Sequence, residues 1–230
     1  MVMAERKSSY RISRVLRGKD EAEKYYDRTS SFYDWFGGVF ERKAADKALD
    51  YLKIQNGDSV LEIGFGTGHC LQQIALLVGN TGKAYGIDIS NGMLEVTRKR
   101  LERASLLDRV ELFQGDASNL PYSSETFDAI LMSFTLELFD TPEIPQVLRE
   151  IKRVLKTGGR LAIVSLSKIN GNSLAISIYE WIHRRWPKYI DCRPIYLEHS
   201  ISEAGYEVQS KEMAKLLTLP IEIVVALKKS

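Results

Sequence analysis

The sequence predicts an α/β fold: a doubly wound sheet of seven mostly parallel strands that ends in an antiparallel hairpin. Two patterns predict it. From residue 59 onward, short apolar runs alternate with longer segments of helical periodicity, which is typical of a parallel sheet with helices on both faces. The last two strand-like runs, 206–216 and 219–228, are separated by little more than Thr218. Such a short link permits only an antiparallel pair, because a parallel return needs a long crossover.

The first half of the predicted order runs from a helix to the second strand. The helix is expected over about 40–53, where apolar residues recur at helical spacing. A turn at 56–58, Asn-Gly-Asp, separates it from the first strand at 59–63. A glycine-rich turn then leads into a helix at about 68–78, and the apolar run 83–88 is the second strand.

The second half repeats this alternation. A helix is expected at about 91–104, and the apolar runs 109–113 and 127–133 are the third and fourth strands. The clearest helical stripe covers about 142–156, and a fifth strand follows at 160–166.

Local signals predict both ends of the 142–156 helix. Pro142 fits its first turn, directly after a cap at Thr141. The pair Gly158 and Gly159 is expected to stop it.

The two ends of the chain differ from this central alternation. Residues 1–40 are predicted to form an N-terminal helical arm or lid, and residues 41–230 a single domain. The first 20 residues are basic, so they are either a solvated arm or a helix that contacts a membrane surface or a partner. Near the other end, 172–186 carries a helical stripe with two tryptophans, and 197–204 fits a short helix.

The bulk composition limits the function classes. A net charge of +2 over 230 residues gives no general argument for nucleic-acid binding. Two cysteines without C-x-x-C spacing and three scattered histidines predict neither a disulfide framework nor a metal site. The charged N-terminus lacks a signal-peptide core, and no apolar run approaches the about 20 residues that span a bilayer. We therefore expect a cytoplasmic protein, soluble or peripheral to the inner face of the membrane, of undetermined oligomeric state.

The most informative stretch is residues 60–68, Val-Leu-Glu-Ile-Gly-Phe-Gly-Thr-Gly. It indicates a buried strand that breaks into glycines at alternate positions, and glycine lets a ligand lie against the main chain. A strand, such a turn and then a helix form the nucleotide crevice of an open α/β sheet. Asp88 ends the second strand, 20 residues after Gly68, where a carboxylate can accept both hydroxyls of a ribose. A nucleoside-like cofactor is therefore expected.

The spacing of the glycines distinguishes between cofactors. Dinucleotide-binding proteins show G-x-G-x-x-G/A, whose last small residue allows close packing of helix and strand. Here His69 occupies that position. An acid, Glu62, also lies two residues before the first glycine, and it favours a cofactor with a positive group near the turn.

Four segments carry a family resemblance. They are LEIGFGTGH (61–69), GIDIS (86–90), FQGDASNLPYSSETFDAI (113–130) and LREIKRVLKTGGRLAI (148–163). With them, the chain from about 25 to 230 resembles class I S-adenosyl-L-methionine (AdoMet)-dependent methyltransferases, which have a Rossmann-like sheet. The branch it resembles contains ubiquinone and menaquinone C-methyltransferases and phosphatidylethanolamine N-methyltransferases. DCRPI (191–195) and LPIEIVVALK (219–228) are also similar to lipid-directed members.

This resemblance implies a role for each cofactor-binding residue. Gly64, Gly66 and Gly68 would lie under the methionine part and the ribose, Glu62 would receive the α-amino group, and Asp88 would hold the ribose hydroxyls. The remaining contacts would come from Ile89, Met93, Asp116, Ala117 and Ser133, with Tyr25 or Tyr33 closing the pocket. Each role has an alternative. Asp88 could cap the next helix, Asp116 could be a turn residue, Glu62 could face a helix N-terminus, and the tyrosines could be packing residues.

For catalysis, the resemblance points to the end of the fourth strand. Ser133 lies where the transferred methyl group would point, and Glu137 is a candidate general base. Many relatives carry a histidine in this region, where this chain has Ser-Phe-Thr-Leu-Glu-Leu-Phe. Catalysis by proximity is therefore expected, and Glu137 could equally be a structural or solvent-facing carboxylate.

The acceptor is less well determined. The resemblance implies an acceptor lid at about 168–200, where tryptophans and isoleucines lie beside arginine and lysine residues. This composition suits a small hydrophobic or lipid acceptor, such as a phospholipid amine or a quinol-like compound, at a membrane surface; a helix packed on the domain is the alternative. Two other functions stay open: an NAD-dependent oxidoreductase and a non-catalytic AdoMet-binding regulatory module.

Overall fold

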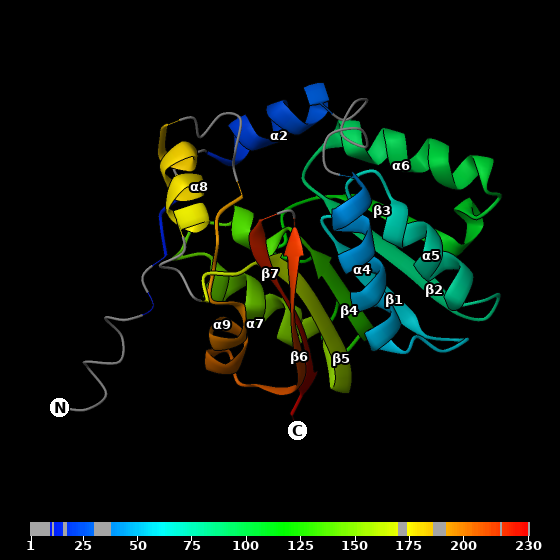
Figure 1. The fold of residues 1–230 in the computed structure, drawn as a ribbon. Coiled ribbons are helices and arrows are strands. Elements are labelled where there is room, and N and C mark those ends of the chain that lie inside the picture. The colour runs from blue at the N-terminus through cyan, green and yellow to red at the C-terminus, as the bar shows by residue number, and fades with distance from the viewer. Residues whose placement is uncertain are drawn as a thin grey trace.

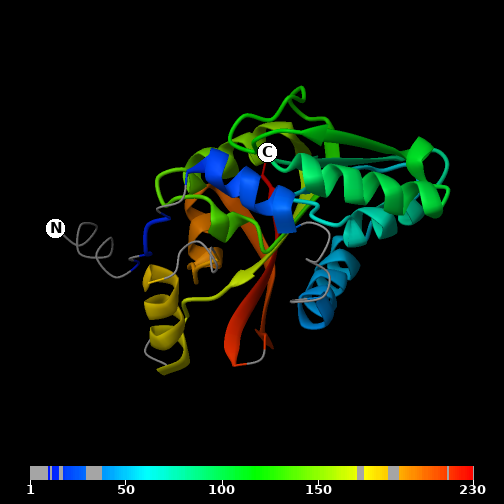
Figure 2. The ribbon, with the colours of Figure 1, turned by 90° about the horizontal axis from the view of Figure 1, so that it is seen from above.

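The structure is a computed structural model that describes residues 10, 12–15, 18–29, 38–169, 174–185, 192–216 and 218–229. Figure 1 shows one open sheet with helices on both of its faces, and a helix, α2 (Lys19–Thr29), that lies above the carboxyl ends of the strands. Figure 2 shows the same helix from above, beside α6 (Asn91–Arg103).

The sheet has seven strands in the order β3-β2-β1-β4-β5-β7-β6. In chain order these strands are β1 (Ser59–Ile63), β2 (Lys83–Asp88), β3 (Val110–Gln114), β4 (Phe127–Ser133), β5 (Leu155–Leu166), β6 (Tyr206–Leu216) and β7 (Leu219–Lys228). The first five pair in parallel, and β7 pairs antiparallel with both β5 and β6. The predicted parallel sheet with a terminal antiparallel hairpin is therefore confirmed.

The core divides into two layers because neighbouring residues of a strand face opposite sides of the sheet. In β1, Val60 packs into one layer and Leu61 into the other. The first layer is covered by α4 (Gly38–Leu52), α5 (His69–Leu77) and α6. The second layer is covered by α7 (Ile144–Val154) and α9 (Leu197–Glu203).

The start of α7 differs from the prediction. The helix begins at Ile144 and has Pro145 in its first turn, while Thr141 caps nothing. Instead, the Thr141 hydroxyl donates to the Ser13 carbonyl of the N-terminal arm. This contact between distant residues replaces the cap that the local sequence favours.

The end of α7 also differs. The helix stops at Val154, and Leu155 already pairs with Phe127 of β4. The Val154 carbonyl accepts a hydrogen bond from the Thr126 amide, just before β4, so it is not free to continue the helix. The glycines at 158–159 therefore do not end the helix, but lie in an irregular part of β5.

Two further segments lie outside the sheet. Helix α8 (Leu174–Arg185) stands to one side of the carboxyl ends of the strands in Figure 1. Residues 12–15 have no helical structure, whereas α2 is helical as expected for the arm.

Candidate functional site

A cavity of about 240 Å³ lies at the carboxyl ends of β1, β2 and β4. It opens where the strand order reverses, between β1 and β4, which is where open α/β sheets bind their ligands. Its wall includes most of the predicted cofactor-binding residues: Glu62, Gly64, Gly66, Asp88, Ile89, Met93, Asp116, Ala117 and Ser133.

Glycine is required at Gly66 and at Gly68 for different physical reasons. At Gly66, φ is +50° and an added Cβ would meet nothing within 4 Å, so the main chain faces open space there. At Gly68, φ is +79° and a Cβ would come within 2.5 Å of the Thr97 side chain in α6. Gly66 therefore leaves room for a ligand, as predicted. Gly68, which does not line the cavity, instead allows α5 to begin close against α6.

Glu62 is the most unusual group in the cavity wall. Its side chain is 3% exposed, and its Oε2 atom has no hydrogen-bond partner among the described residues. Burial, the negative charge of Asp88 and a hydrogen bond from the Leu71 amide act on it together, and burial raises its pKa well above the usual range. Glu62 thus accepts a hydrogen bond from the first turn of α5, while its Oε2 atom is buried without a partner among the described residues, where a positively charged donor would be favoured.

Asp88 holds the glycine turn. Its Oδ2 atom accepts a hydrogen bond from the Gly66 amide, and its Oδ1 atom accepts one from the Ser90 amide, both at 2.9 Å. Burial raises the pKa of Asp88 to about 6. The cap of α6 is Ser90 and not Asp88, because the Ser90 hydroxyl accepts from the Met93 amide. Ile89 also donates to this carboxylate, which has about four acceptor sites in all, so Asp88 can still accept from a ligand hydroxyl.

Asp116 is held by the arm. Its Oδ2 atom lies 2.5 Å from the Lys19 ammonium, which also pairs with Glu143 at 2.8 Å. Asp116 also accepts from the amide and hydroxyl of Ser118, as a turn residue would. Burial raises the pKa of Asp116, but the hydrogen bonds and the charge of Lys19 outweigh it, so the pKa is lowered on balance. Both roles considered for this aspartate are thus compatible with its position in the cavity wall.

The aromatic cover of the cavity differs from the expectation. Tyr26, and not Tyr25, lines the cavity from α2, and the Tyr25 ring packs edge-on against it at 5.5 Å. Tyr33 lies outside the described residues. The apolar part of the wall also contains Phe65, which follows the first glycine of the turn.

The two candidate catalytic residues are in different surroundings. Ser133 lies at the end of β4 and lines the cavity, while Glu137 does not. Glu137 is fully buried in the short helix η2 (Leu136–Leu138), so it does not face solvent. Its Oε1 atom accepts from the Leu166 amide at 3.2 Å.

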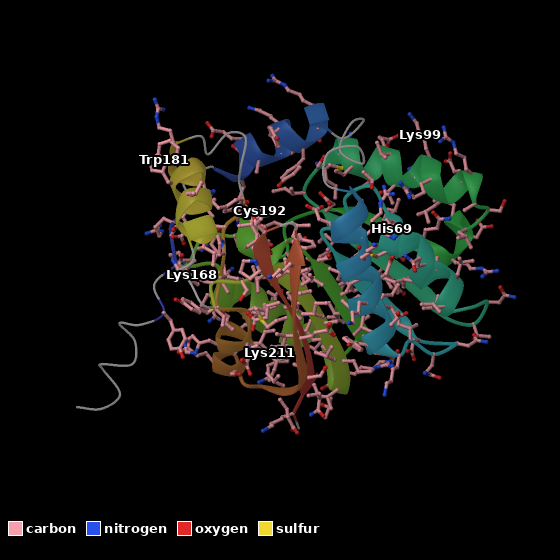
Figure 3. All side chains as sticks on the ribbon, in the orientation of Figure 1. His69, Lys99, Lys168, Trp181, Cys192 and Lys211 are labelled. Carbon is pink, nitrogen blue, oxygen red and sulfur yellow. The ribbon has the colours of Figure 1, made fainter. Side chains whose placement is uncertain are left out.

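Several residues of the wall were not predicted. Lys19, Glu41 and Arg42 reach it from the N-terminal helices, and His69 reaches it from the first turn of α5. His69, labelled in Figure 3, lies 2.8 Å from the Asp46 carboxylate, in agreement with its expected place in a first helical turn. The alternation of charged and apolar residues in the arm carried no signal that distinguished these residues from a solvated face.

The charges around the cavity favour a cationic ligand. The carboxylates of the wall outnumber its lysine and arginine side chains: they are Glu41, Glu62, Asp88, Asp116, Asp140 and Glu143, against Lys19 and Arg42. Within the described ranges, no three His, Cys, Asp or Glu side chains gather as they would around a metal ion. In that same part of the chain, no helix has the length and apolar character needed to cross a bilayer.

Comparisons with known proteins extend this picture. Residues 60–159 match a family described as a methyltransferase domain. A demethylmenaquinone methyltransferase of Listeria welshimeri is 33% identical over 156 residues, which are 66% of this chain and 65% of that protein. The match thus spans just under two thirds of the relative's length.

Solved structures share the fold over nearly the whole chain. The [4+2]-cyclase SpnF superimposes with a TM-score of 0.76 at 19% identity, covering 95% of this chain and 98% of that one. A SAM-dependent methyltransferase from Aquifex aeolicus gives a TM-score of 0.64 at 21% identity, covering 87% and 98%. At such identities these similarities show the fold alone.

Proposed function

We propose that this chain, which carries a domain of the AdoMet-dependent methyltransferase family over residues 60–159, transfers a methyl group from AdoMet to a small hydrophobic acceptor. The family expected from the glycine turn and the three segments that follow it agrees with the match of residues 60–159 to a methyltransferase domain.

One observation carries the proposal: the buried Oε2 atom of Glu62 has no partner among the described residues and belongs to the same cavity wall as the open main chain at Gly66. AdoMet is a net cation with an α-amino group, and its ribose offers two hydroxyls. Glu62 would receive the amino group, Asp88 would accept from the hydroxyls, and Asp116 from the adenine amino group. The apolar side chains of Ile89 and Met93 would pack against the adenine ring.

Methyl transfer from a sulfonium requires little from the protein beyond positioning the two reactants. When bound, AdoMet supplies a methyl group attached to its sulfonium sulfur, and this sulfur is the leaving group, as a neutral sulfide. The cavity wall would hold the acceptor in line with that methyl group and exclude water, and such positioning can contribute roughly 7–11 kcal/mol. Ser133 lies where the acceptor would meet the cofactor, at the carboxyl end of β4.

The acceptor would be a quinol-like compound or a phospholipid amine. A quinol-like acceptor is supported by the Listeria relative, whose name is demethylmenaquinone methyltransferase. A hydrophobic acceptor is supported by Phe134, Leu138 and Phe139, which line the same cavity.

Helix α8 would bring the protein to a lipid surface. Its side chains Ile178 and Trp181 are 48% and 55% exposed, and Arg185 is exposed one turn further on. In Figure 3, Trp181 lies on the outer side of α8, away from the sheet. Apolar side chains beside a cation suit the boundary of an anionic membrane. Co-sedimentation with anionic vesicles tests this contact, and binding that Trp181→Ala leaves unchanged would contradict it.

A second candidate is an activity other than methyl transfer, because one fold can carry more than one chemistry. The deciding experiment is transfer of a labelled methyl group from AdoMet into a total lipid extract, compared with an extract of soluble metabolites. We expect label in the lipid extract. No transfer into either extract, from protein that binds S-adenosylhomocysteine, would favour the second candidate or a non-catalytic module.

A further inference from the structure

Two fully buried charged side chains lie just behind the cavity wall: Glu137 and Arg193. Glu137 belongs to η2, which follows β4. Arg193 belongs to the stretch that an isolated bridge between Ser167 and Ile195 holds at the end of β5. Its neighbour Cys192, labelled in Figure 3, lies between α8 and the strands.

Neither side chain is satisfied by the described residues. Arg193 donates one hydrogen bond, from Nη2 to the Phe139 carbonyl at 2.5 Å, while its Nε and Nη1 atoms have no partner there. The Oε2 atom of Glu137 has none either, so it accepts nothing from Arg193. Burying a charged atom without a hydrogen bond is costly, so the unsatisfied atoms of these two side chains indicate a missing polar group.

The surroundings of the pair connect it to the cavity. Phe139, whose carbonyl Arg193 binds, lines the cavity, as does Asp140 after it. Glu41 lines the cavity from α4, and its negative charge acts on Glu137. Burial raises the pKa of Glu137 to about 8 against the hydrogen bonds from Leu166 and Ser165. Burial also lowers the pKa of Arg193 to about 10, although the charges of Asp140 and Glu137 oppose this.

We propose that Glu137 and Arg193 bind the methyl acceptor through an ionisable hydroxyl group of the phenol or enol type. The hydroxyl would enter between η2 and residues 192–195, donate to Oε2 of Glu137 and accept from an N–H group of Arg193. This inference rests on the proposed function, since it names the acceptor chemistry of that same site. It assigns Arg193 a role that the sequence did not indicate.

The pair can also activate such a group. The O–H bond of the acceptor breaks, its proton passes to the Glu137 carboxylate, and the electron pair stays on the acceptor oxygen beside the Arg193 guanidinium. A protonated amine fits less well, because it offers no lone pair to Arg193 and brings a positive charge beside it. The site therefore distinguishes a hydroxylated acceptor from a phospholipid amine.

Binding tests the proposal without turnover. The protein is saturated with S-adenosylhomocysteine and titrated anaerobically with a 1,4-naphthohydroquinone bearing one short prenyl chain, and separately with its di-O-methyl ether. We expect the wild type to bind the diol at least about tenfold more tightly than the ether, because the ether cannot donate. Equal affinities for the two ligands would overturn the proposal, and this comparison needs no variant.

Two variants locate the effect. Glu137→Gln keeps the shape of the side chain, and Arg193→Lys keeps the charge but loses the planar fork. Each should lower the preference for the diol by about tenfold, while the exposed controls Glu203→Gln and Arg149→Lys should not. Thermal unfolding and S-adenosylhomocysteine affinity report whether each variant is folded. A folded Glu137→Gln protein with the full preference would contradict the assignment.

A pH profile separates activation from a structural role. The Glu137 base is active when ionised, so methylation of the diol should rise with pH and level off above about 8. Glu137→Gln should lose this rise and Glu137→Asp should recover part of it. If the wild type does not bind S-adenosylhomocysteine, the proposed function itself fails. If it binds and methylates phosphatidylethanolamine vesicles but not the diol, only the present inference fails.

Discussion

Replacing Asp88 by asparagine tests the cofactor site most sharply. The substitution keeps the size of the side chain but removes its charge. Hydrogen bonds to a charged group contribute about 1.5–3 kcal/mol each, and neutral ones about 0.5–1.5 kcal/mol. With two ribose hydroxyls sharing this carboxylate, affinity for S-adenosylhomocysteine should fall by at least about 1.4 kcal/mol, or tenfold. Isothermal calorimetry measures the loss, with the exposed residue in Asp108→Asn as the matched control.

The Asp88→Asn variant should also change how ligand affinity depends on pH. The pKa of Asp88 is raised to about 6 in the free protein, and the hydroxyls of a ligand favour the ionised form. Ligand binding therefore competes with a proton below that pH, and wild-type affinity should fall as pH drops from about 6 to 5. Asp88→Asn should show no such fall. Unchanged affinity in a folded Asp88→Asn protein, or the same pH dependence in both proteins, would refute the role of Asp88.

Three further predictions concern the cavity wall and the glycine turn. In calorimetry, Glu62→Gln should lower the affinity for S-adenosylhomocysteine by about tenfold but leave the affinity for 5′-methylthioadenosine, which lacks the amino group, unchanged. Equal losses of affinity for the two ligands would contradict the assignment. Gly68→Ala should lower the free energy of unfolding by about 1–3 kcal/mol in urea titrations, because its Cβ would meet Thr97, and adding Thr97→Ala should recover part of that loss. Lys19→Met should change stability by less than about 1 kcal/mol, since the ion pair with Asp116 is partly exposed. It should also tighten S-adenosylhomocysteine binding by releasing that aspartate, and weaker binding would disagree with this account.

The strands and the glycine turn could be predicted because their signals are local. The apolar runs 59–63, 83–88 and 127–133 are bounded by turn residues, and the structure gives them these same limits. Asp88 follows from its place at the end of one of these runs. Each such feature depends on residues that are close in the sequence, where periodicity and backbone preference act directly.

The features that escaped prediction depend on distant contacts. Thr141 bonds to the arm at Ser13 instead of capping α7, and Lys19 reaches Asp116 across 97 positions. The burial of Glu137 and Arg193 has the same cause, because it requires β4, β5 and the 192–195 stretch to meet. Glu137 was singled out as a candidate base, but a charged residue is ordinarily expected at the surface, so no local pattern indicated that it or Arg193 is fully buried.

The packing role of Gly68 was not predicted, for a related reason. Three alternating glycines suggest a single purpose, the approach of a ligand. In the structure, the open main chain is at Gly66, while Gly68 accommodates the neighbouring helix at Thr97. Gly68 thus allows two helices, α5 and α6, to approach each other at the end of the turn.

A crystal structure of the protein with S-adenosylhomocysteine tests the cofactor site most directly. We expect the ribose hydroxyls within hydrogen-bonding distance of Asp88 and the α-amino group at the Oε2 atom of Glu62, which has no partner among the described residues. A cavity that stays closed by the protein's own side chains, or that accepts NAD while excluding S-adenosylhomocysteine, would contradict it.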